Sequence, residues 1–358
     1  MKAKKNVLIA PLDWGLGHAT RCIPVINAFL KQGANVCIAG SGKSLKLLQK
    51  EFPQLHFFNL SGYNINYASG GSMVLSMLKQ VPKILSGIAT EKRQLRRIVA
   101  ENNIDIVVSD NRYGAYSNKI KNIFITHQLN IQVPEGLQFL KPVVNKLNTY
   151  FISKFNECWV PDVENGFKLS GELSESKNIS VYSIGPLSRF ADVKKEKQQY
   201  TYPIIAIISG PEPQRSIFEG KVIEQLYDLH TAALIIRGKP DDSQELKSRG
   251  MIDFKNHASA DEIFSLINEQ TVFISRSGYS TIMDLAALGN KAILIPTPGQ
   301  TEQEYLATYF SEKEIFFYQS QKQLNLDVAL RAAGNYKGLE TILANELLNK
   351  SVKRILNT

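Results

Sequence analysis

Short runs rich in β-branched residues alternate along the chain with longer stretches whose apolar residues recur every three or four positions. The short runs predict strands, and the longer stretches predict the amphipathic helices between them. In the first half the predicted strands cover residues 7–10, 35–39, 56–60, 105–109, 122–126 and 158–160. In the second half they cover residues 204–209, 232–237, 251–254, 271–275, 292–295 and 315–318. This alternation predicts an α/β protein with two Rossmann-like, doubly wound parallel sheets.

The length of the chain supports a two-domain arrangement, because 358 residues exceed what one hydrophobic core usually supports. Residues 186–203 form a polar run without periodic apolar positions, which is typical of a linker. We therefore expect an N-terminal Rossmann-like domain over 1–185, a linker over 186–203 and a C-terminal Rossmann-like domain over 204–335. Residues 336–358 predict a final helix that is free to pack back on the N-terminal domain. Ligands bind at the carboxyl ends of such strands, so we expect the two domains to face each other across a cleft.

The composition is that of a soluble globular protein, with 44% hydrophobic and 21% charged residues. The apolar run near the N-terminus is cut short by Asp13 and by glycines, and no stretch approaches the ~18 apolar residues of a membrane span. The three cysteines lack metal-ligand spacing and fit a reducing compartment. We therefore expect a cytoplasmic protein.

The positive charge is concentrated in one half of the chain. Residues 1–190 contain 23 Lys and Arg against 12 Asp and Glu, whereas the remainder contains 19 against 21. An anionic acceptor or the inner face of an anionic membrane would suit such a surface. Residues 72–98 and 139–147 are cationic and amphipathic, which is typical either of membrane-interface helices or of packed outer helices. Nucleic acid is disfavoured, because exposed aromatic residues do not interleave the basic ones.

The turn after the first predicted strand presents a histidine. Gly15 and Gly17 resemble a dinucleotide-binding turn, but Thr20 replaces the third glycine and no acid follows the second strand, so NAD is disfavoured. The turn places His18 at a helix N-terminus, where a neutral imidazole can take a proton from a hydroxyl. Asp110 ends another strand of the same domain and is the candidate for orienting His18.

Other polar residues at the strand ends of this domain are candidates for the acceptor side of the site, with plain loop positions as the alternative. The candidates are Gly15, Gly17, Arg112 and His127.

The second domain contains two small-residue turns, each between a strand and a helix. Backbone amides at helix N-termini bind anions, so these turns predict a diphosphate site. The candidate diphosphate ligands are Ser209, Gly210, Arg276, Ser277, Gly278, Tyr279, Ser280 and Thr281. Asp284 could accept hydrogen bonds from a ribose diol and Phe254 could pack on a base, while Glu302 and Gln303 suit hexose hydroxyls. The predicted site lacks an Asp-x-Asp pair, so no metal is expected there.

These residues carry a family resemblance. Over essentially its full length the chain resembles glycosyltransferases of the two-domain GT-B fold. The block from Arg276 to Tyr305 is similar to the bacterial N-acetylglucosaminyltransferases that act on the lipid-linked peptidoglycan precursor, although Asp284 stands where that family has Glu. The segment around His18, with Asp110, resembles UDP-glycosyltransferases that use a histidine base oriented by aspartate.

The resemblance implies an inverting, metal-independent enzyme without a cofactor that moves a hexose or N-acetylhexosamine from a UDP-sugar to an acceptor hydroxyl. A glycan or glycolipid is the expected acceptor. The resemblance also implies that the domain over 1–185 binds the acceptor and that the domain over 204–335 binds the nucleotide sugar. Two alternatives stay open: a nucleotide-sugar epimerase of the same fold, and a non-catalytic subunit that binds a nucleotide sugar or recruits a partner to the membrane. Product formation with and without acceptor separates these three hypotheses.

Overall fold

The computed structural model describes residues 4–63, 73–176, 178–193, 201–240, 242–244, 246–342 and 345–357, without the side chains of 73–79 and 345. These residues form two compact units. The N-terminal unit contains the described residues up to Leu187 together with the last helix, and the C-terminal unit contains those from Ser188 to residue 342. The centre of the predicted linker, residues 194–200, lies outside the described part.

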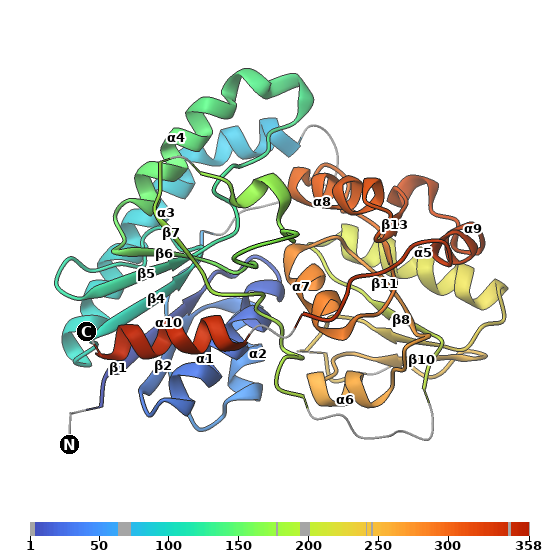
Figure 1. Ribbon diagram of the computed structural model, residues 1–358, viewed down its shortest axis with the longest axis horizontal. Helices are drawn as coiled ribbons and strands as arrows, with labels where there is room; N and C mark the ends of the chain where they lie inside the picture. The colour runs from blue at the N-terminus through green and yellow to red at the C-terminus, as the bar shows by residue number, and fades with distance from the viewer. Residues whose placement is uncertain are drawn as a thin grey trace. The chain divides into compact units, whose positions relative to one another are not determined.

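A fully parallel sheet forms the centre of the N-terminal unit (Figure 1). Its strands are β1 (Asn6–Pro11), β2 (Asn35–Gly40), β3 (His56–Asn59), β4 (Ile106–Asp110), β5 (Lys121–Ile125), β6 (Glu157–Val160) and β7 (Val181–Ser183). Their order is β3-β2-β1-β4-β5-β6-β7. The chain thus winds outward in one direction from β1 and in the other from β4, and the switch between the two directions lies between these strands.

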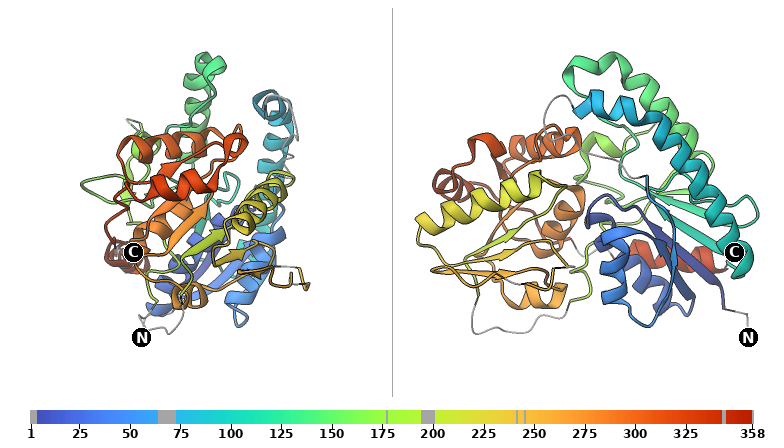
Figure 2. Two further views of the ribbon diagram at one scale, coloured as in Figure 1. Left: turned by 90° about the vertical axis from the view of Figure 1, so that its right-hand side faces the viewer. Right: turned by 180° about the vertical axis from the view of Figure 1, so that it is seen from behind.

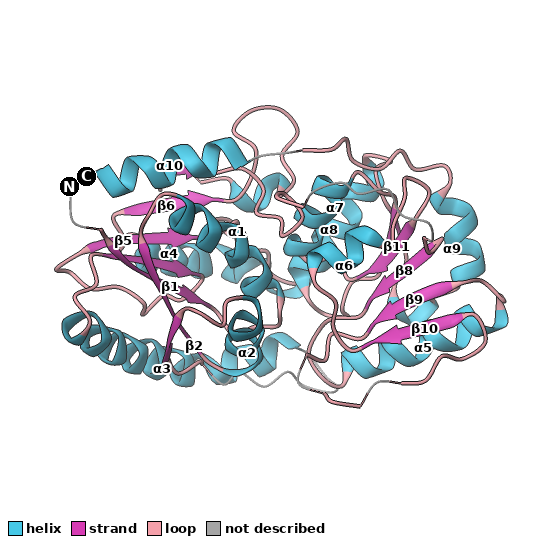
Figure 3. Ribbon diagram, turned by 90° about the horizontal axis from the view of Figure 1, so that it is seen from below, coloured by secondary structure: helices cyan, strands magenta, loops and turns pink. Residues whose placement is uncertain are grey.

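Helices cover both faces of this sheet (Figure 3). They are α1 (Gly17–Lys31), α2 (Gly42–Glu51), α3 (Met73–Glu101), η1 (Glu135–Leu140), α4 (Lys141–Ile152), η2 (Gly171–Ser174) and α10 (Asn345–Asn357). Leu8 and Ala10 of β1 share one hydrophobic cluster with Leu95 and Ile98 of α3. Successive strand residues point to opposite faces, so Val7 and Ile9 face the other side of the sheet, where α1 contacts β1.

The C-terminal unit repeats this plan with a second parallel sheet. Its strands are β8 (Ile204–Ile207), β9 (Ala233–Ile236), β10 (Ile252–Lys255), β11 (Val272–Ser275), β12 (Ala292–Leu294) and β13 (Phe317–Tyr318). Its helices are α5 (Gln214–Asp228), α6 (Ala260–Ser265), α7 (Tyr279–Leu288), α8 (Thr301–Glu312), η3 (Gln321–Gln323) and α9 (Leu326–Ala333). The order β10-β9-β8-β11-β12-β13 places the switch point between β8 and β11. Phe218 and Val222 of α5 pack with Leu326 of α9 on one face of the sheet.

All twelve predicted strands are confirmed, with ends that differ by one or two residues. The pattern missed β7, which is only three residues long and leaves Val181 and Tyr182 exposed at a sheet edge, so it lacks an apolar run. The final helix starts at Asn345 rather than at residue 336. The preceding backbone bonds to the C-terminal unit instead: Lys337 N–H donates to Glu314 O, and Ile342 N–H donates to Ala286 O.

Helix α10 belongs to the N-terminal unit although it ends the chain, and it lies alongside α1 (Figures 1 and 2). Its apolar face buries Leu348, Val352 and Ile355. On its polar side, Arg354 forms two hydrogen bonds of 2.8 and 2.7 Å with the carboxylate of Glu157 on β6. The last residues of the sequence therefore complete the first structural unit.

The pair between Arg354 and Glu157 gives a testable prediction. Burial raises the pKa of Glu157, but hydrogen bonds from Arg354, Trp159 and Lys121 outweigh it and lower the pKa to about 2. Arg354→Met should lower the free energy of unfolding of the N-terminal unit by about 1 kcal/mol near pH 7, since Arg354 is 40% exposed and water screens its charge. The difference in free energy of unfolding between Arg354→Met and the unsubstituted protein should narrow as the pH falls from ~4.3, the ordinary pKa of Glu, towards 2, where Glu157 becomes protonated.

Tryptophan fluorescence during urea unfolding measures this change, because both tryptophans, Trp14 and Trp159, lie in the N-terminal unit. Arg331→Met is the matched control, since Arg331 forms an exposed ion pair with Asp327 in the C-terminal unit. An Arg354→Met curve that coincides with that of the unsubstituted protein would show that the pair does not hold α10 in place.

Candidate functional site

The switch point of the N-terminal sheet brings the predicted histidine and aspartate together. Asp110 is the last residue of β4 and pairs in register with Pro11, the last residue of β1. His18 lies in the first turn of α1, which follows β1 after a short loop. His18 Nδ1 is 3.2 Å from Asp110 Oδ2, within hydrogen-bonding distance. The histidine side chain is 14% exposed whereas Asp110 is fully buried, so the imidazole is the accessible partner.

A buried arginine that the sequence analysis did not identify completes this cluster. Arg21 Nε lies 2.9 and 2.8 Å from the two carboxylate oxygens of Asp110, and its Nη2 also donates to Oδ1. Nη2 is 2.9 Å from His18 Nδ1, and Nη1 is 3.3 Å from Nδ1 of His127. The available signal was spacing: Arg21 follows His18 by three residues in a helix, and such residues share one face.

The electrostatics of the cluster determine which proton positions are possible. Burial alone raises the pKa of Asp110, but Arg21 and His18 outweigh it and hold that pKa well below its usual range. Arginine only donates and a carboxylate only accepts, so neutral His18 uses Nδ1 for one of these partners at a time. When Nδ1 carries the proton and donates it to Asp110, the lone pair is on Nε2. That tautomer is the one a general base requires.

Arg112 is not an acceptor-side residue, contrary to the sequence prediction. It is fully buried, and its guanidinium donates to the carboxylate of Glu91 and to the carbonyl oxygens of Pro11, Leu60 and Ser61. The strand end was predicted correctly, but the side chain turns into the core. Arg112 therefore stabilises the N-terminal unit.

The other acceptor-side candidates surround the histidine cluster. Gly15 lies in the loop after β1, where its carbonyl oxygen accepts a hydrogen bond from Ser44 of α2, and Gly17 is the first residue of α1. His127 is buried and contacts the cluster through Arg21. Its place is therefore behind His18 rather than at the surface. An acceptor role for the two glycines stays a prediction.

The switch point of the C-terminal sheet brings the two small-residue turns together. Ser209 and Gly210 follow β8, and residues 276–278 follow the neighbouring β11. Gly278 is the N-cap of α7, so the first N–H groups of this helix point towards the turn, at the positive end of the helix dipole. Gly210 has a φ of 116°, which favours glycine. A Cβ added there would lie 3.7 Å from Thr297 Oγ1 and 3.8 Å from Arg276 Nε.

Thr297 contributes a hydroxyl group that the sequence analysis missed. The residue is 1% exposed, and its Oγ1 has no hydrogen-bond partner within the described chain. Its backbone N–H donates to Gln303 Oε1 at 2.8 Å, which fixes the loop between β12 and α8. A buried hydroxyl without a partner is costly, and a ligand oxygen at this position would satisfy it.

Arg276 is also placed differently from the prediction. It is buried, and its guanidinium stacks over Phe218 and donates to neutral oxygens, which are the backbone carbonyls of Gln214, Ile295 and Pro296 and the side chain of Gln321. These bonds tie together the loops that follow β8 and β12. Burial lowers its pKa to about 9. Arg276 thus acts on the diphosphate candidates through the backbone that it holds and through its charge.

Asp284 is occupied by the chain itself rather than open to a ribose. Its carboxylate accepts hydrogen bonds from Ser188 Oγ at 2.8 Å and from Arg189 Nε at 3.2 Å. Burial raises its pKa, and Arg189 and Ser188 only partly oppose this shift. The acid was predicted at the correct turn of α7, but it anchors the segment that leads into the C-terminal unit. The predicted ribose contact stays a prediction, because Ser188 and Arg189 already bond to this carboxylate.

The remaining donor candidates have different environments. Phe254 is a core residue of the sheet and packs with Ile235, so it does not stack on a base. Gln303 is buried, and its backbone oxygen accepts a 2.7 Å hydrogen bond from Ser277 Oγ. It thereby connects the start of α8 to the turn before α7. Glu302 is half-buried in the first turn of α8. In the described part of the chain, no three His, Cys, Asp or Glu side chains form a group that could hold a metal ion.

Two family models match the chain, one on each unit. The glycosyltransferase family 28 C-terminal domain matches residues 215–334, and glycosyl transferase family 1 matches residues 7–164. The first match contains the turn before α7 and Thr297, and the second contains His18, Arg21 and Asp110. Both sets of candidate residues therefore lie inside segments that glycosyltransferases share.

Relatives agree with these matches. An uncharacterized glycosyltransferase of Methanosarcina acetivorans is 24% identical over 329 residues, which cover 86% of this chain and 81% of the relative. The UDP-N-acetylglucosamine–N-acetylmuramyl-(pentapeptide) pyrophosphoryl-undecaprenol N-acetylglucosamine transferase of Gloeothece citriformis is 24% identical over 290 residues, covering 78% and 72%. The crystal structure of the glycotransferase of kitacinnamycin superposes with a TM-score of 0.59 at 16% identity, covering 99% of this chain and 95% of that one. The chain is a glycosyltransferase with the GT-B fold, and its C-terminal unit is similar to the glycosyltransferase family 28 C-terminal domain.

Proposed function

We propose that this glycosyltransferase is inverting and metal-independent, and that it moves a hexose or N-acetylhexosamine from a UDP-sugar to a hydroxyl of a glycan or glycolipid. The observation that carries the proposal is the placement of two polar clusters at the switch points of the two sheets. Open parallel sheets bind ligands at those points. One cluster offers a base, and the other offers anion-binding amides.

His18 is the proposed base. With its proton on Nδ1 held by Asp110, Nε2 takes the proton of the acceptor hydroxyl as the oxygen attacks the anomeric carbon. The bond between that carbon and the phosphate oxygen breaks, and UDP leaves with the electron pair. A single displacement of this kind inverts the anomeric configuration. Asp110 holds the proton of Nδ1 in place while Nε2 takes up the acceptor proton, which then passes to water.

The turn before α7 is the proposed diphosphate site. The backbone amides at the start of α7 and the unpartnered hydroxyl of Thr297 are donors, and the buried charge of Arg276 lies beside Gly210. Together they would stabilise the negative charge that develops on the leaving diphosphate, which is the largest electrostatic demand of the reaction. The UDP-sugar assignment draws on the Gloeothece citriformis relative, whose name includes UDP-N-acetylglucosamine.

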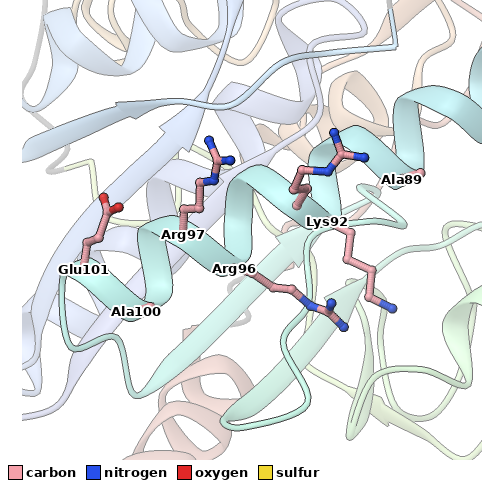
Figure 4. A pocket seen from close by; sticks show the side chains of 7 residues that line it. Ala89, Lys92, Arg96, Arg97, Ala100 and Glu101 are labelled. Carbon is pink, nitrogen blue, oxygen red and sulfur yellow. The ribbon is translucent and has the colours of Figure 1, made fainter.

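A lipid-linked or otherwise anionic acceptor fits the surface of the N-terminal unit, and we propose peripheral contact with the inner face of an anionic membrane. Residues Phe139, Val143, Leu147 and Tyr150 recur at helical spacing through η1 and α4 and are 73, 65, 45 and 54% exposed. A hollow on α3 is lined by Lys92, Arg93, Arg96 and Arg97, with Arg97 on one side of the helix and Arg96 on the other (Figure 4). An apolar stripe with nearby cations suits an anionic lipid surface.

Part of the membrane-interface prediction lies outside the description, because the side chains of residues 73–79 are not described. Further along α3, Val81 and Leu85 are exposed, whereas Ile84 and Ile88 pack inward. The helix therefore has exposed apolar side chains as well as packed ones, and its membrane contact stays a prediction. No helix in the described part of the chain has the length and hydrophobicity to cross a membrane.

The proposed reaction is tested by separating donor binding from turnover. UDP should raise the melting temperature more than GDP or NAD, because a ligand that binds only the folded state stabilises it. His18→Gln should keep this shift but lose at least about 100-fold in transfer rate, since it removes the base. Measurement of free UDP and of glycosylated product with and without acceptor distinguishes transfer from epimerisation. A folded protein that no nucleotide stabilises would contradict the donor site.

Thr297→Val tests the diphosphate site more narrowly. Because Oγ1 has no partner in the unliganded protein, the substitution should leave the melting temperature unchanged or raise it. Loss of one hydrogen bond to a charged ligand should nevertheless weaken UDP binding about tenfold in calorimetry. Thr271→Val is the matched control, since its buried hydroxyl donates to Tyr202 O at 2.7 Å. That variant should lose stability and keep its UDP affinity, and the opposite pattern would remove Thr297 from the site.

Vesicle sedimentation tests the membrane contact. The protein should bind phosphatidylglycerol vesicles better than phosphatidylcholine vesicles, and less at high salt. Val143→Glu with Leu147→Glu should reduce binding by at least about tenfold, because two apolar side chains no longer enter the interface. Met251→Glu, at a residue 57% exposed in the C-terminal unit, is the control and should bind normally. If both variants sedimented equally with the vesicles, the exposed apolar side chains of α4 would not be the membrane contact.

A further inference from the structure

The cluster behind His18 raises a question that a simple histidine–aspartate pair does not answer. A histidine beside an unbalanced buried carboxylate gains a proton readily, because the negative charge favours the imidazolium. A protonated histidine cannot act as a base. We propose that Arg21 is a positioning residue which balances the charge of Asp110 and so keeps His18 uncharged at neutral pH. This inference rests on the proposed role of His18 as the base.

The geometry supports this assignment. Arg21 and Asp110 are 2% and 0% exposed, and Arg21 meets both carboxylate oxygens. Low exposure means that water screens these two charges little. Because they are opposite and adjacent, they largely cancel each other at the position of the imidazole. Arg21 Nη2 also lies 2.9 Å from His18 Nδ1, closer than the 3.2 Å from Nδ1 to Asp110 Oδ2. A positive charge on the imidazole would therefore face a guanidinium as well as a carboxylate.

The other titratable neighbours do not change this balance. Cys22 of α1 lies 3.6 Å from Asp110 Oδ2, and burial raises the pKa of its thiol, so it stays uncharged. His127, which follows β5, lies near Arg21 Nη1 through Nδ1. Because arginine only donates, that hydrogen bond requires an unprotonated Nδ1 on His127. The charges that face His18 from α1 and β4 are thus those of Arg21 and Asp110.

Arg21 also fixes the direction of the carboxylate. Its guanidinium is a planar fork that meets both oxygens of Asp110, which a lysine ammonium group cannot do. One oxygen, Oδ2, remains close to His18 Nδ1 in this arrangement. Arg21 therefore has two separable effects, one from its charge and one from its shape. Arg21→Lys keeps the first and removes the second.

The test is a direct titration of His18 in the full-length protein without substrate. Nitrogen NMR of protein labelled at histidine resolves this, since the chain has only five histidines and His18→Gln identifies the signal. In the unsubstituted protein His18 should be uncharged at pH 7. Arg21→Met should move the midpoint up by about one to two pH units, because Asp110 is no longer balanced. Arg21→Lys should stay close to the unsubstituted protein.

A second comparison covers the case in which Arg21→Met fails to fold because it leaves a buried carboxylate unpaired. Asp110→Asn keeps the arginine alone, and Arg21→Met with Asp110→Asn removes both charges. The His18 midpoint in Asp110→Asn should then lie at least about one pH unit below that of the double variant. Equal midpoints in these two proteins would overturn the proposal, as would an unchanged or lower midpoint in a folded Arg21→Met.

The kinetic consequence distinguishes this inference from the proposed function. If His18 is the base, kcat/KM falls as the pH drops through its midpoint, and Arg21→Met should move this acidic limb to higher pH by the same shift. A structural role alone would lower the rate without moving the limb. Absence of any transfer reaction would defeat the proposed function while leaving the titration result intact. If transfer occurs but the His18 midpoint is unchanged in Arg21→Met, only the role proposed for Arg21 is contradicted.

Discussion

Parallel pairing at the two switch points, β1 with β4 and β8 with β11, is the constraint on which the rest of the structure depends. Parallel strands end at a common edge, and their helices leave from that edge in opposite directions at the switch. Residues distant in sequence are therefore fixed at neighbouring positions: Asp110 beside Pro11, and Ser275 beside Ile207. The candidate functional residues of each unit lie just beyond these paired strand ends.

Arg276 differs from the other buried arginines of the described chain in having no carboxylate partner among the ion pairs. In the N-terminal unit Arg21 pairs with Asp110 and Arg112 pairs with Glu91, so each buried cation has a carboxylate partner. In the C-terminal unit Arg215 and Arg237 both pair with Glu219, whereas Arg276 is buried among neutral oxygens, and burial lowers its pKa. A base works best with little net charge beside it, whereas a diphosphate is bound best by uncompensated positive charge. The contrast matches the roles proposed for the two clusters.

The sequence predicted where chain segments end better than where side chains point. Strand positions and the contact between His18 and Asp110 follow from periodicity and topology, which is why they were predicted correctly. Arg112, Arg276 and Phe254 also lie at or near strand ends, but each turns inward. A single sequence does not reveal that direction, because it depends on the depth of packing around each turn.

The residues that prediction missed have a common physical cause. Arg21 is important because of a partner far away in the sequence, Asp110. Thr297 is important because its hydroxyl has no partner within the described chain. Arg21 stands in an otherwise apolar helix face, where its value depends on a carboxylate 89 residues later. Asp284 shows the converse, because its spacing from the turn suggested a ribose ligand while Ser188 and Arg189 take up its carboxylate. The role of a polar residue in such a fold depends on its hydrogen bonds and ion pairs, and these are seen only in the three-dimensional structure.

Helix α10 adds a further constraint, since it makes the N-terminal unit discontinuous in sequence. Glu157 is a buried carboxylate on β6, and its partners include Lys121 from the neighbouring β5 and Arg354 from the last helix. Until α10 docks, this carboxylate lacks one of the cations that offset its burial. The N-terminal unit therefore reaches its full stability only after the C-terminal unit has been synthesised. The segment that completes the unit with the proposed base thus follows, in the sequence, the unit with the proposed donor site.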